Sequence, residues 1–315
     1  MEYTVFGKEH IPQAAALLRA ARDREAAFLA ADWNPFTRGL PDSPAPTLDG
    51  FAANGLGMAA TRGNTLVGFL CPLGPWQDGG GTKRVYIPLY GHGTAADCAV
   101  ESVYENLYTR VAENWLRQGV STHAITFFAH DGAGIGTFFD LGFGKCCTDR
   151  IRSCDAPFPA VSPPPGVTFA PVRPEEIAAI RPLRRALHRH MAKSPCFLTE
   201  SDAEYQLWLT RVERSDRRIY AAYADGAPVA YMDVDACGDS YLSVSPDMQN
   251  IVGAYCLPTY RGMGIAAALT AYVARTMWRA GYRYLGVDHE STNPAARHFW
   301  RKHFAPYTFS LLRRL

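Results

Sequence analysis

Residues 256–274 of the chain read CLPTYRGMGIAAALTAYVA. Pro258 ends an apolar run, an arginine and two spaced glycines follow, and an alanine-rich segment of helical pattern starts at Ile265. A strand that runs directly into a helix leaves the first backbone N–H groups of that helix unpaired and partly positive, so anions bind there. Gly262 and Gly264 carry no Cβ atom that would hold a phosphate away from the backbone. The turn therefore predicts a phosphate-binding site.

The spacing of this turn excludes two common nucleotide-binding loops. No Gly-Lys-Ser/Thr follows the glycines, as it would in a P-loop, and the G-x-G-x-x-G spacing of dinucleotide-binding proteins is absent. A tight connection without any ligand remains an alternative interpretation of the turn.

Length and composition restrict the class of protein. A chain of 315 residues, 48% of them hydrophobic, predicts two domains of ordinary size. The formal net charge of +2 gives no electrostatic reason to expect binding to nucleic acid or to a membrane surface. The first residues do not resemble a signal peptide, and no run of 18 apolar residues occurs, so we expect a cytoplasmic protein. The eight cysteines form no CxxC pair or zinc-type spacing, and we expect free thiols and no metal site.

The chain repeats itself. Shifting the first half by 162 positions aligns six identical residues without a gap: Val67 with Val229, Leu107 with Leu269, Val111 with Val273, Ala112 with Ala274, Arg117 with Arg279 and Gly119 with Gly281. A proline-dense stretch lies between the copies. We therefore expect a domain at 1–154, a linker at 155–166 and a second domain at 167–315.

Each copy has the pattern of a mixed α/β domain. In the second copy, strands are expected at 250–257 and 282–288, a long helix at 265–280 and a short helix at 294–303. Asn293 before a proline indicates the N-cap of the short helix. The order strand, helix, strand predicts a local parallel crossover.

The second copy resembles the GCN5-related N-acetyltransferase (GNAT) superfamily. Arg261-x-x-Gly264-x-Ala266, after an apolar strand, is similar to the acyl-coenzyme A motif of that family. Downstream, Asn293, Ala296 and Trp300 match the family pattern, although His303-Phe304 replaces its terminal Gly-Phe. The resemblance extends over residues 167–315.

The first copy resembles the same fold without its cofactor turn. With the shift of 162, Gly262, Gly264 and Ala266 align with Val100, Ser102 and Tyr104, whose side chains would obstruct a diphosphate. We therefore expect two tandem GNAT-like acyl-CoA N-acyltransferase domains, of which the first is degenerate, and one bound coenzyme A per chain.

The resemblance implies acetyl-CoA as co-substrate, held where the strand ending at Leu257 separates from the next strand. A backbone N–H there would polarise the thioester carbonyl. The residues that it implies for cofactor binding are Tyr255, Cys256, Leu257, Arg261, Gly262, Met263, Gly264, Ile265, Ala266, Asn293 and Trp300. Arg297, Arg301 and Lys302 are further candidates, for the outer phosphate of the cofactor.

The catalytic side chains are less clearly indicated. An amine acceptor must lose a proton, yet residues 250–257 contain no acid. We take Glu290 as the expected base, with Asp288 and His289 as rivals. Trp300 stands where the family commonly has a tyrosine that acts as the general acid. An indole N–H cannot protonate the leaving thiolate in its place. Tyr255 is therefore the expected acid, with Tyr307 or solvent as alternatives.

The function expected from this reasoning is an N-acetyltransferase that moves an acetyl group from acetyl-CoA to an amine by direct attack. The acceptor is a small-molecule amine or a peptide amine. Two alternatives remain: a non-catalytic acyl-CoA-binding sensor or scaffold, and a protein that binds another nucleotide. The sequence does not determine the acceptor or the oligomeric state.

Overall fold

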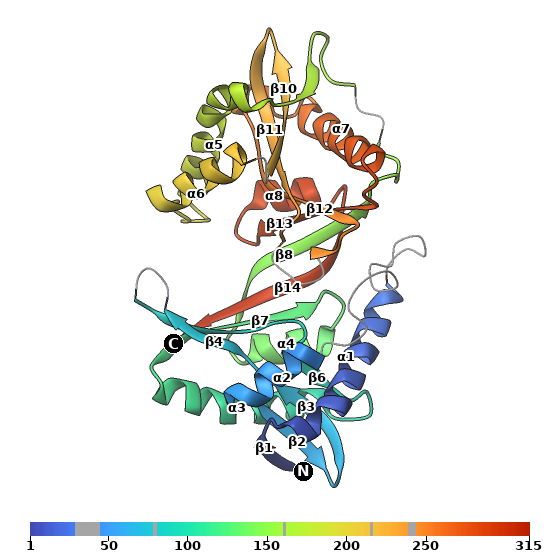
Figure 1. Ribbon diagram of the computed structural model, residues 1–315, viewed down its shortest axis with the longest axis vertical. Helices are drawn as coiled ribbons and strands as arrows, with labels where there is room; N and C mark the ends of the chain where they lie inside the picture. The colour runs from blue at the N-terminus through green and yellow to red at the C-terminus, as the bar shows by residue number, and fades with distance from the viewer. Residues whose placement is uncertain (29–44, 78–80, 160–161, 215–216, 239–243) are drawn as a thin grey trace. The chain divides into compact units, whose positions relative to one another are not determined.

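The computed structural model describes residues 1–28, 45–77, 81–159, 162–214, 217–238 and 244–315. By residue contacts, these divide into two compact units, Met1–Thr148 with Pro306–Leu315, and Asp149–Ala305. Figure 1 labels most of the helices and strands. Among the described helices, none is long and apolar enough to cross a membrane.

The first unit is built on two runs of strands. One sheet has the strand order β1-β2-β3-β6. The other strands, in the order β4-β5-β7-β14-β8, belong to a second sheet of ten strands. The elements are β1 (Glu2–Val5), η1 (Lys8–His10), α1 (Ile11–Ala26), α2 (Ala45–Asn54), β2 (Met58–Arg62), β3 (Thr65–Leu70), β4 (Leu73–Gln77), β5 (Lys83–Ile87), β6 (His92–Thr94), α3 (Val100–Arg117), β7 (Val120–Phe128), α4 (Gly132–Asp140), β8 (Gly144–Ser153) and β14 (Ala305–Arg314).

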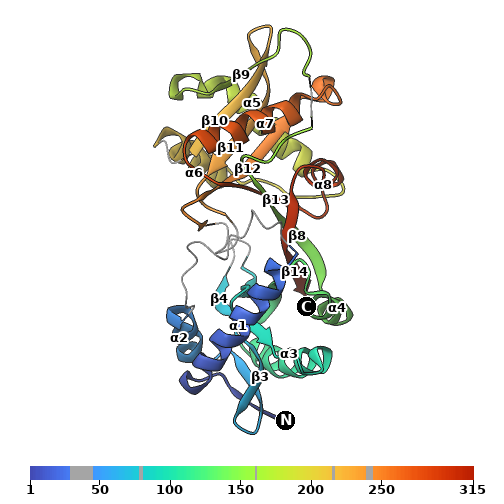
Figure 2. The same ribbon diagram turned by 90° about the vertical axis from the view of Figure 1, so that its right-hand side faces the viewer.

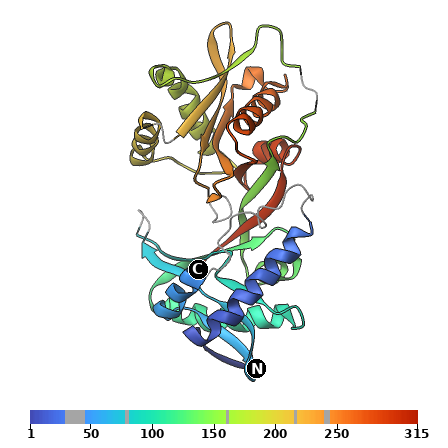
Figure 3. The same cartoon turned by 45° about the vertical axis from the view of Figure 1, so that its right-hand side comes forward.

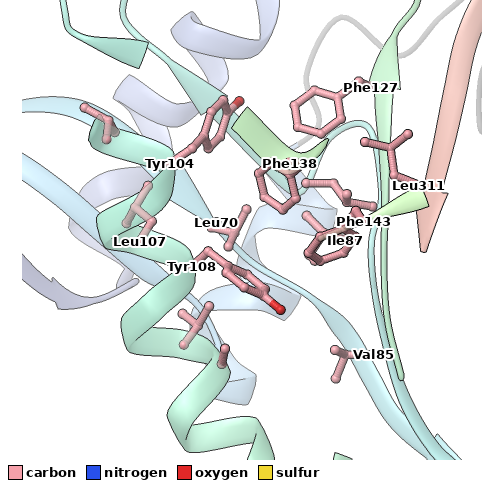
Figure 4. Packing of buried hydrophobic residues seen from close by; sticks show 14 of the residues in the cluster. Leu70, Val85, Ile87, Tyr104, Leu107, Tyr108, Phe127, Phe138, Phe143 and Leu311 are labelled. Atoms are coloured by element: carbon pink, nitrogen blue, oxygen red, sulfur yellow. The ribbon is translucent and has the colours of Figure 1, made fainter. Parts of the chain in front are cut away.

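The core of the first unit lies between α3 and the strands. Leu107, Val111 and Trp115 follow one another at helical spacing and are fully or almost fully buried. Figure 4 shows part of this cluster, which includes Leu311 from β14. A second cluster packs α1 and α2 against β2 and β3.

The second unit is a single twisted sheet with helices on both faces. Its strand order is β8-β13-β12-β11-β10-β9, with β12 and β13 parallel and the pairs from β9 to β12 antiparallel. The elements are β9 (Thr168–Pro171), η3 (Pro174–Glu176), α5 (Ile177–Met191), α6 (Asp202–Glu213), β10 (Arg217–Ala224), β11 (Ala227–Asp235), β12 (Met248–Cys256), η5 (Pro258–Tyr260), α7 (Ile265–Arg279), β13 (Tyr284–Glu290) and α8 (Pro294–Trp300). Figures 2 and 3 show α7 on one face of these strands and α5 and α6 on the other.

Two hydrophobic clusters hold the helices to this sheet. Under α7, Leu269, Val273 and Met277 are completely buried against side chains such as Val234 and Leu285. Each of these side chains buries enough apolar surface to contribute roughly 1.5–3 kcal/mol. Because successive residues of a strand face opposite sides, Tyr231 packs with α5 and α6 while its neighbours Ala230 and Met232 pack with α7.

The last strand of each expected copy lies partly or wholly in the other of the two units. The expected division into 1–154, 155–166 and 167–315 stays a prediction. β14, which ends the second copy, pairs with β7 in the first unit, with Leu311 opposite Ile125. β8, which ends the first copy, crosses from the first unit into the second after Thr148, before the expected linker at 155–166. Of that linker, residues 160 and 161 lie outside the described part of the chain.

Candidate functional site

The turn between β12 and α7 has a backbone shape that requires glycine. Gly262 and Gly264 have φ angles of +79° and +78°, and Gly264 is the N-cap of α7. A Cβ atom added at Gly262 would meet nothing within 4 Å. The left-handed backbone conformation therefore requires glycine at position 262 even where no protein atom is close. A ligand bound at the turn would be a second reason for the missing side chain.

The first turn of α7 offers a row of backbone donors. The first bond from this turn joins the N–H of Ala268 to the carbonyl of Gly264, 2.9 Å away. The N–H groups of Ile265, Ala266 and Ala267 precede it and have no acceptor within the helix, as in any α-helix. Together with the helix dipole, they favour an anion at this end of α7.

Strands β12 and β13 separate halfway along their length. Their parallel pairing ends at Ile251 opposite Val287, whereas β12 stays paired with β11 as far as Cys256. The N–H of Leu257 donates to the carbonyl of Val229 at 3.0 Å. Because backbone groups alternate along a strand, those of Cys256 point to the opposite, open edge. The strand separation expected from the family resemblance is thus present in the structure.

A cavity of about 430 Å³ occupies this separation. Its lining includes residues from the α7 face, such as Ala254 and Cys256, and from the α5 face, such as Tyr231 and Tyr255. The cavity therefore connects the two faces of the sheet where β12 leaves β13. The remaining lining residues are Leu187, His190, Ala230, Met232, Tyr260, Arg261, Gly262, Gly264, Ile265, Ala266, Ala267, Leu269, Asn293, Ala295, Ala296, Phe299, Trp300, Lys302 and His303.

The structure brings most of the residues expected to bind the cofactor to this one cavity. Those that line it are Tyr255, Cys256, Arg261, Gly262, Gly264, Ile265, Ala266, Asn293 and Trp300. Leu257 and Met263 do not line it: Leu257 packs into the clusters on both faces of the sheet, and Met263 is exposed. Of the outer-phosphate candidates, Lys302 lines the cavity, and Arg297 and Arg301 do not. The roles of these residues stay predictions.

Asn293 and Trp300 also have structural roles. The side chain of Asn293 accepts a hydrogen bond from the N–H of Ala296 at 3.2 Å, so it caps α8 as expected. Trp300 is 5% exposed and packs edge-on against Phe299 and Phe304. The indole thus forms an apolar wall of the cavity.

The expected base does not lie on the cavity wall. Glu290 ends β13 and is absent from the lining; its carbonyl accepts from the N–H of Asn293 at 3.0 Å. His289 is buried, and its Nε2 accepts a hydrogen bond from Arg150 at 3.1 Å, which ties up that lone pair. Tyr307 lies in β14, in the first unit.

Charged and titratable groups along β12 define the chemistry of the lining. Arg261 donates through Nε to the carbonyl of Cys256 at 3.0 Å, and its guanidinium lies 5.3 Å from the ring centre of Tyr255. Burial raises the pKa of the Cys256 thiol, although Arg261 acts in the opposite direction. A thiol with a raised pKa is a poor nucleophile near neutral pH, which favours direct attack on a thioester over an acyl-cysteine.

Sequence reasoning missed the wall that α5 contributes. Leu187 and His190 line the cavity from this helix, and His190 lies 6.5 Å from Tyr255 between ring centres. Their spacing from the buried Leu183 follows the helical repeat, so the sequence contained a signal that both face the sheet. It contained no signal for the position along the sheet that they reach.

The equivalent region of the first unit is filled by protein. α3 begins at Val100, the residue aligned with Gly262, so the positions aligned with the glycine turn already lie inside the helix. The hydroxyl of Tyr104 lies 2.8 Å from Nδ1 of His92, and its ring packs edge-on against Phe138 (Figure 4). Tyr104 is buried in the core at the position aligned with Ala266.

Comparisons with known proteins agree with this geometry. Residues 184–305 match the model of the acetyltransferase (GNAT) family. A GCN5-related N-acetyltransferase from Sphaerobacter thermophilus is similar in structure, with a TM-score of 0.59, 14% sequence identity and coverage of 99% of this chain and 95% of that chain. A comparison with curated proteins gave no match.

Two further solved structures are more distant. A tandem GNAT protein from the clavulanic acid biosynthesis pathway has a TM-score of 0.47 and 18% identity, and covers 99% of this chain and 98% of that chain. A GCN5-related N-acetyltransferase from Kribbella flavida has a TM-score of 0.44 and 15% identity, over 73% and 81% of the two chains.

Residues 184–305, within the second unit, thus match the GNAT acetyltransferase family, and the fold of the whole chain is similar to that of a GCN5-related N-acetyltransferase. The predicted fold class and the family resemblance are confirmed. The family match indicates an N-acyltransferase in general terms.

Proposed function

We propose that the second unit binds acetyl-CoA in the 430 Å³ cavity and transfers its acetyl group to an amine by direct attack. The observation that carries the proposal is one continuous cavity that joins the N-terminus of α7 to the open edge of β12. An anionic diphosphate fits the first of these, and a pantetheine arm, which needs backbone hydrogen bonds, fits the second.

The open edge also suits the reacting carbonyl. A backbone N–H that points into the strand separation, such as that of Cys256, can donate to an oxygen that gains negative charge as the amine attacks. Donors that are already in place before the reaction supply much of the catalytic effect in acyl transfer. Removal of one such donor typically costs about 10²–10³-fold in kcat.

The first unit is proposed to bind no coenzyme A. Tyr104 and Phe138 fill the space beside α3, and the helix starts where the phosphate turn would have to be. Calorimetry on the full chain should therefore give one equivalent of acetyl-CoA. Two equivalents would contradict the assignment of the first copy as degenerate.

The same cavity could serve a sensor or scaffold that binds acyl-CoA without turning it over. Two observations favour this second candidate: Trp300 occupies the position of the family's acid, and Glu290 lies off the cavity wall.

Binding and turnover separate the candidates. Thermal shift with acetyl-CoA, coenzyme A and ATP should show stabilisation by the first two only, because a ligand selective for the folded state raises its stability. Release of free thiol from acetyl-CoA in the presence of primary amines then identifies an enzyme. Binding without thiol release would identify a sensor, and stabilisation by ATP alone would overturn both.

A further inference from the structure

The cavity carries a titratable side chain that none of the expected roles uses. His190, near the C-terminus of α5, is half-buried and faces the ring of Tyr255 across 6.5 Å. Within the described part of the chain, neither of its ring nitrogens has a hydrogen-bond partner. Its ring is therefore available to a ligand that enters the cavity from the α5 face of the sheet.

No carboxylate that could act as an alternative base lines the described part of the cavity around His190. The ionisable side chains that share the described lining are Tyr231 from β11, Tyr255 and Cys256 from β12, Tyr260 and Arg261 after β12, and Lys302 and His303 after α8; Arg189 and Lys193 flank His190 in the sequence. On the elements packed against α5, Asp233 is bound by Arg217, and Glu200 is bound by Arg184. Among these groups, only an imidazole readily accepts a proton near neutral pH.

The second imidazole, His303, lies on the other side of the site. It follows α8, its ring is 5.0 Å from that of Phe299, and its carbonyl accepts from Arg152 at 3.2 Å. Burial, followed by the charges of Arg152 and Lys302, lowers the pKa of His303. It stands beside Lys302, a candidate for the outer phosphate of the cofactor, whereas His190 stands beyond the open edge of β12.

We propose that His190 is the catalytic residue that takes the proton from the acceptor amine, and that the acceptor enters from the α5 face. This inference rests on the proposed function. The amine nitrogen forms a bond to the thioester carbonyl carbon, and the carbon–sulfur bond breaks with its electron pair leaving on the thiolate. His190 first accepts the proton of the ammonium form of the acceptor and later returns it to solvent. After the attack the nitrogen loses its second proton to solvent, and solvent protonates the thiolate.

The test compares two acceptors on the full chain. Benzylamine is protonated at pH 8 and needs a base, whereas hydroxylamine is already unprotonated. With His190→Gln, we expect kcat/KM for benzylamine to fall by about 10²–10⁴-fold, the range typical of a lost general base. For hydroxylamine the loss should stay below about tenfold, since no proton must be removed before attack. The ascending limb of the pH profile for benzylamine should also move to higher pH, because without the base only the free amine, whose fraction rises with pH, can attack.

Three further measurements make the result specific. Acetyl-CoA affinity by calorimetry should be unchanged in His190→Gln, and the NMR titration of the His190 ring should move when acetyl-CoA is bound. In His190→Ala, added imidazole should restore benzylamine turnover, which also covers the case that the Gln variant folds poorly. His298 is exposed and lies outside the cavity lining, so His298→Gln serves as the control. We expect it to have the activity of the natural protein.

Each other outcome counts against the proposal. Equal losses for the two amines, no rescue by imidazole, or a shift of the pH limb in His303→Gln instead would overturn the assignment of His190 while leaving acetyl transfer intact. Binding of acetyl-CoA without turnover of either amine by the natural protein would remove the transfer function and this assignment together. Absence of acetyl-CoA binding would refute the proposed function itself.

Discussion

The two ends of α7 provide a controlled test of phosphate binding. Gly262 before the helix and Gly281 after it have φ angles of +79° and +92°. A Cβ atom at either position would meet no neighbour within 4 Å. The substitutions Gly262→Ala and Gly281→Ala therefore impose the same kind of backbone strain without a steric clash, but only Gly262 lines the cavity.

The expected cost in stability is similar for the two variants. Holding an L-residue in the left-handed region costs roughly 1–2 kcal/mol. For a unit of about this size, 1 kcal/mol lowers the melting temperature by roughly 2–4 °C, so each variant should melt about 2–8 °C lower. Differential scanning calorimetry measures this directly.

The expected effect on binding differs. In Gly262→Ala, either the new methyl group occupies the cavity or the turn shifts and moves the N–H groups of α7 away from the diphosphate. A hydrogen bond to a charged group contributes about 1.5–3 kcal/mol, and loss of one would weaken acetyl-CoA binding by roughly ten- to a hundredfold. Gly281→Ala should bind acetyl-CoA as the natural protein does. If calorimetry shows equal affinity for both variants despite the same loss of stability, the amides at this turn do not hold the phosphates.

Three further predictions concern stability. A fragment of residues 167–315 lacks β8, which borders β13 in the second unit. We expect this fragment to show neither a cooperative melt nor acetyl-CoA binding. A folded fragment would show that β8 is dispensable. Arg152→Lys should lower the free energy of unfolding by about 2–4 kcal/mol, because Arg152 is buried and donates to three carbonyls, including that of His303; urea denaturation measures the loss, and an unchanged midpoint would refute it. Burial, followed by the charge of Arg313, lowers the pKa of His123 to about 4, below its ordinary 6.5. Between these values the unfolded chain binds the proton and the folded one does not, so acidification from pH 6.5 to 4 should cost about 3 kcal/mol, and His123→Gln should remove most of this pH dependence in thermal melts.

The parts of the site that were predictable are local in the sequence. Gly262 and Gly264 could be found because a strand, a bare turn and a helix follow one another within 20 residues and must form the anion site together. Asn293 could be recognised as a helix cap for the same reason, since a cap depends on the three residues that follow it. The internal repeat extended this reasoning to Tyr104, whose size at the aligned position indicates a filled site in the first copy.

Other features depend on contacts between distant segments. His190 and Tyr255 are far apart in the chain, and they meet because α5 packs across β11 and β12. Glu290 lies beyond the point where the pairing of β13 with β12 ends, and it does not line the cavity. No local pattern encodes either distance.

The amino-acid sequence alone determined the elements of this protein, its two copies and the bare turn at Gly262–Gly264, because helix periodicity, capping and glycine conformation act over a few residues. The tertiary structure alone decided which strands complete each sheet and which side chains surround the cavity. β8 and β14 have ordinary strand patterns that any sheet edge could accept, and the choice of edge depends on the packing of the whole chain. The same packing places the imidazole of His190 beside the open edge of β12.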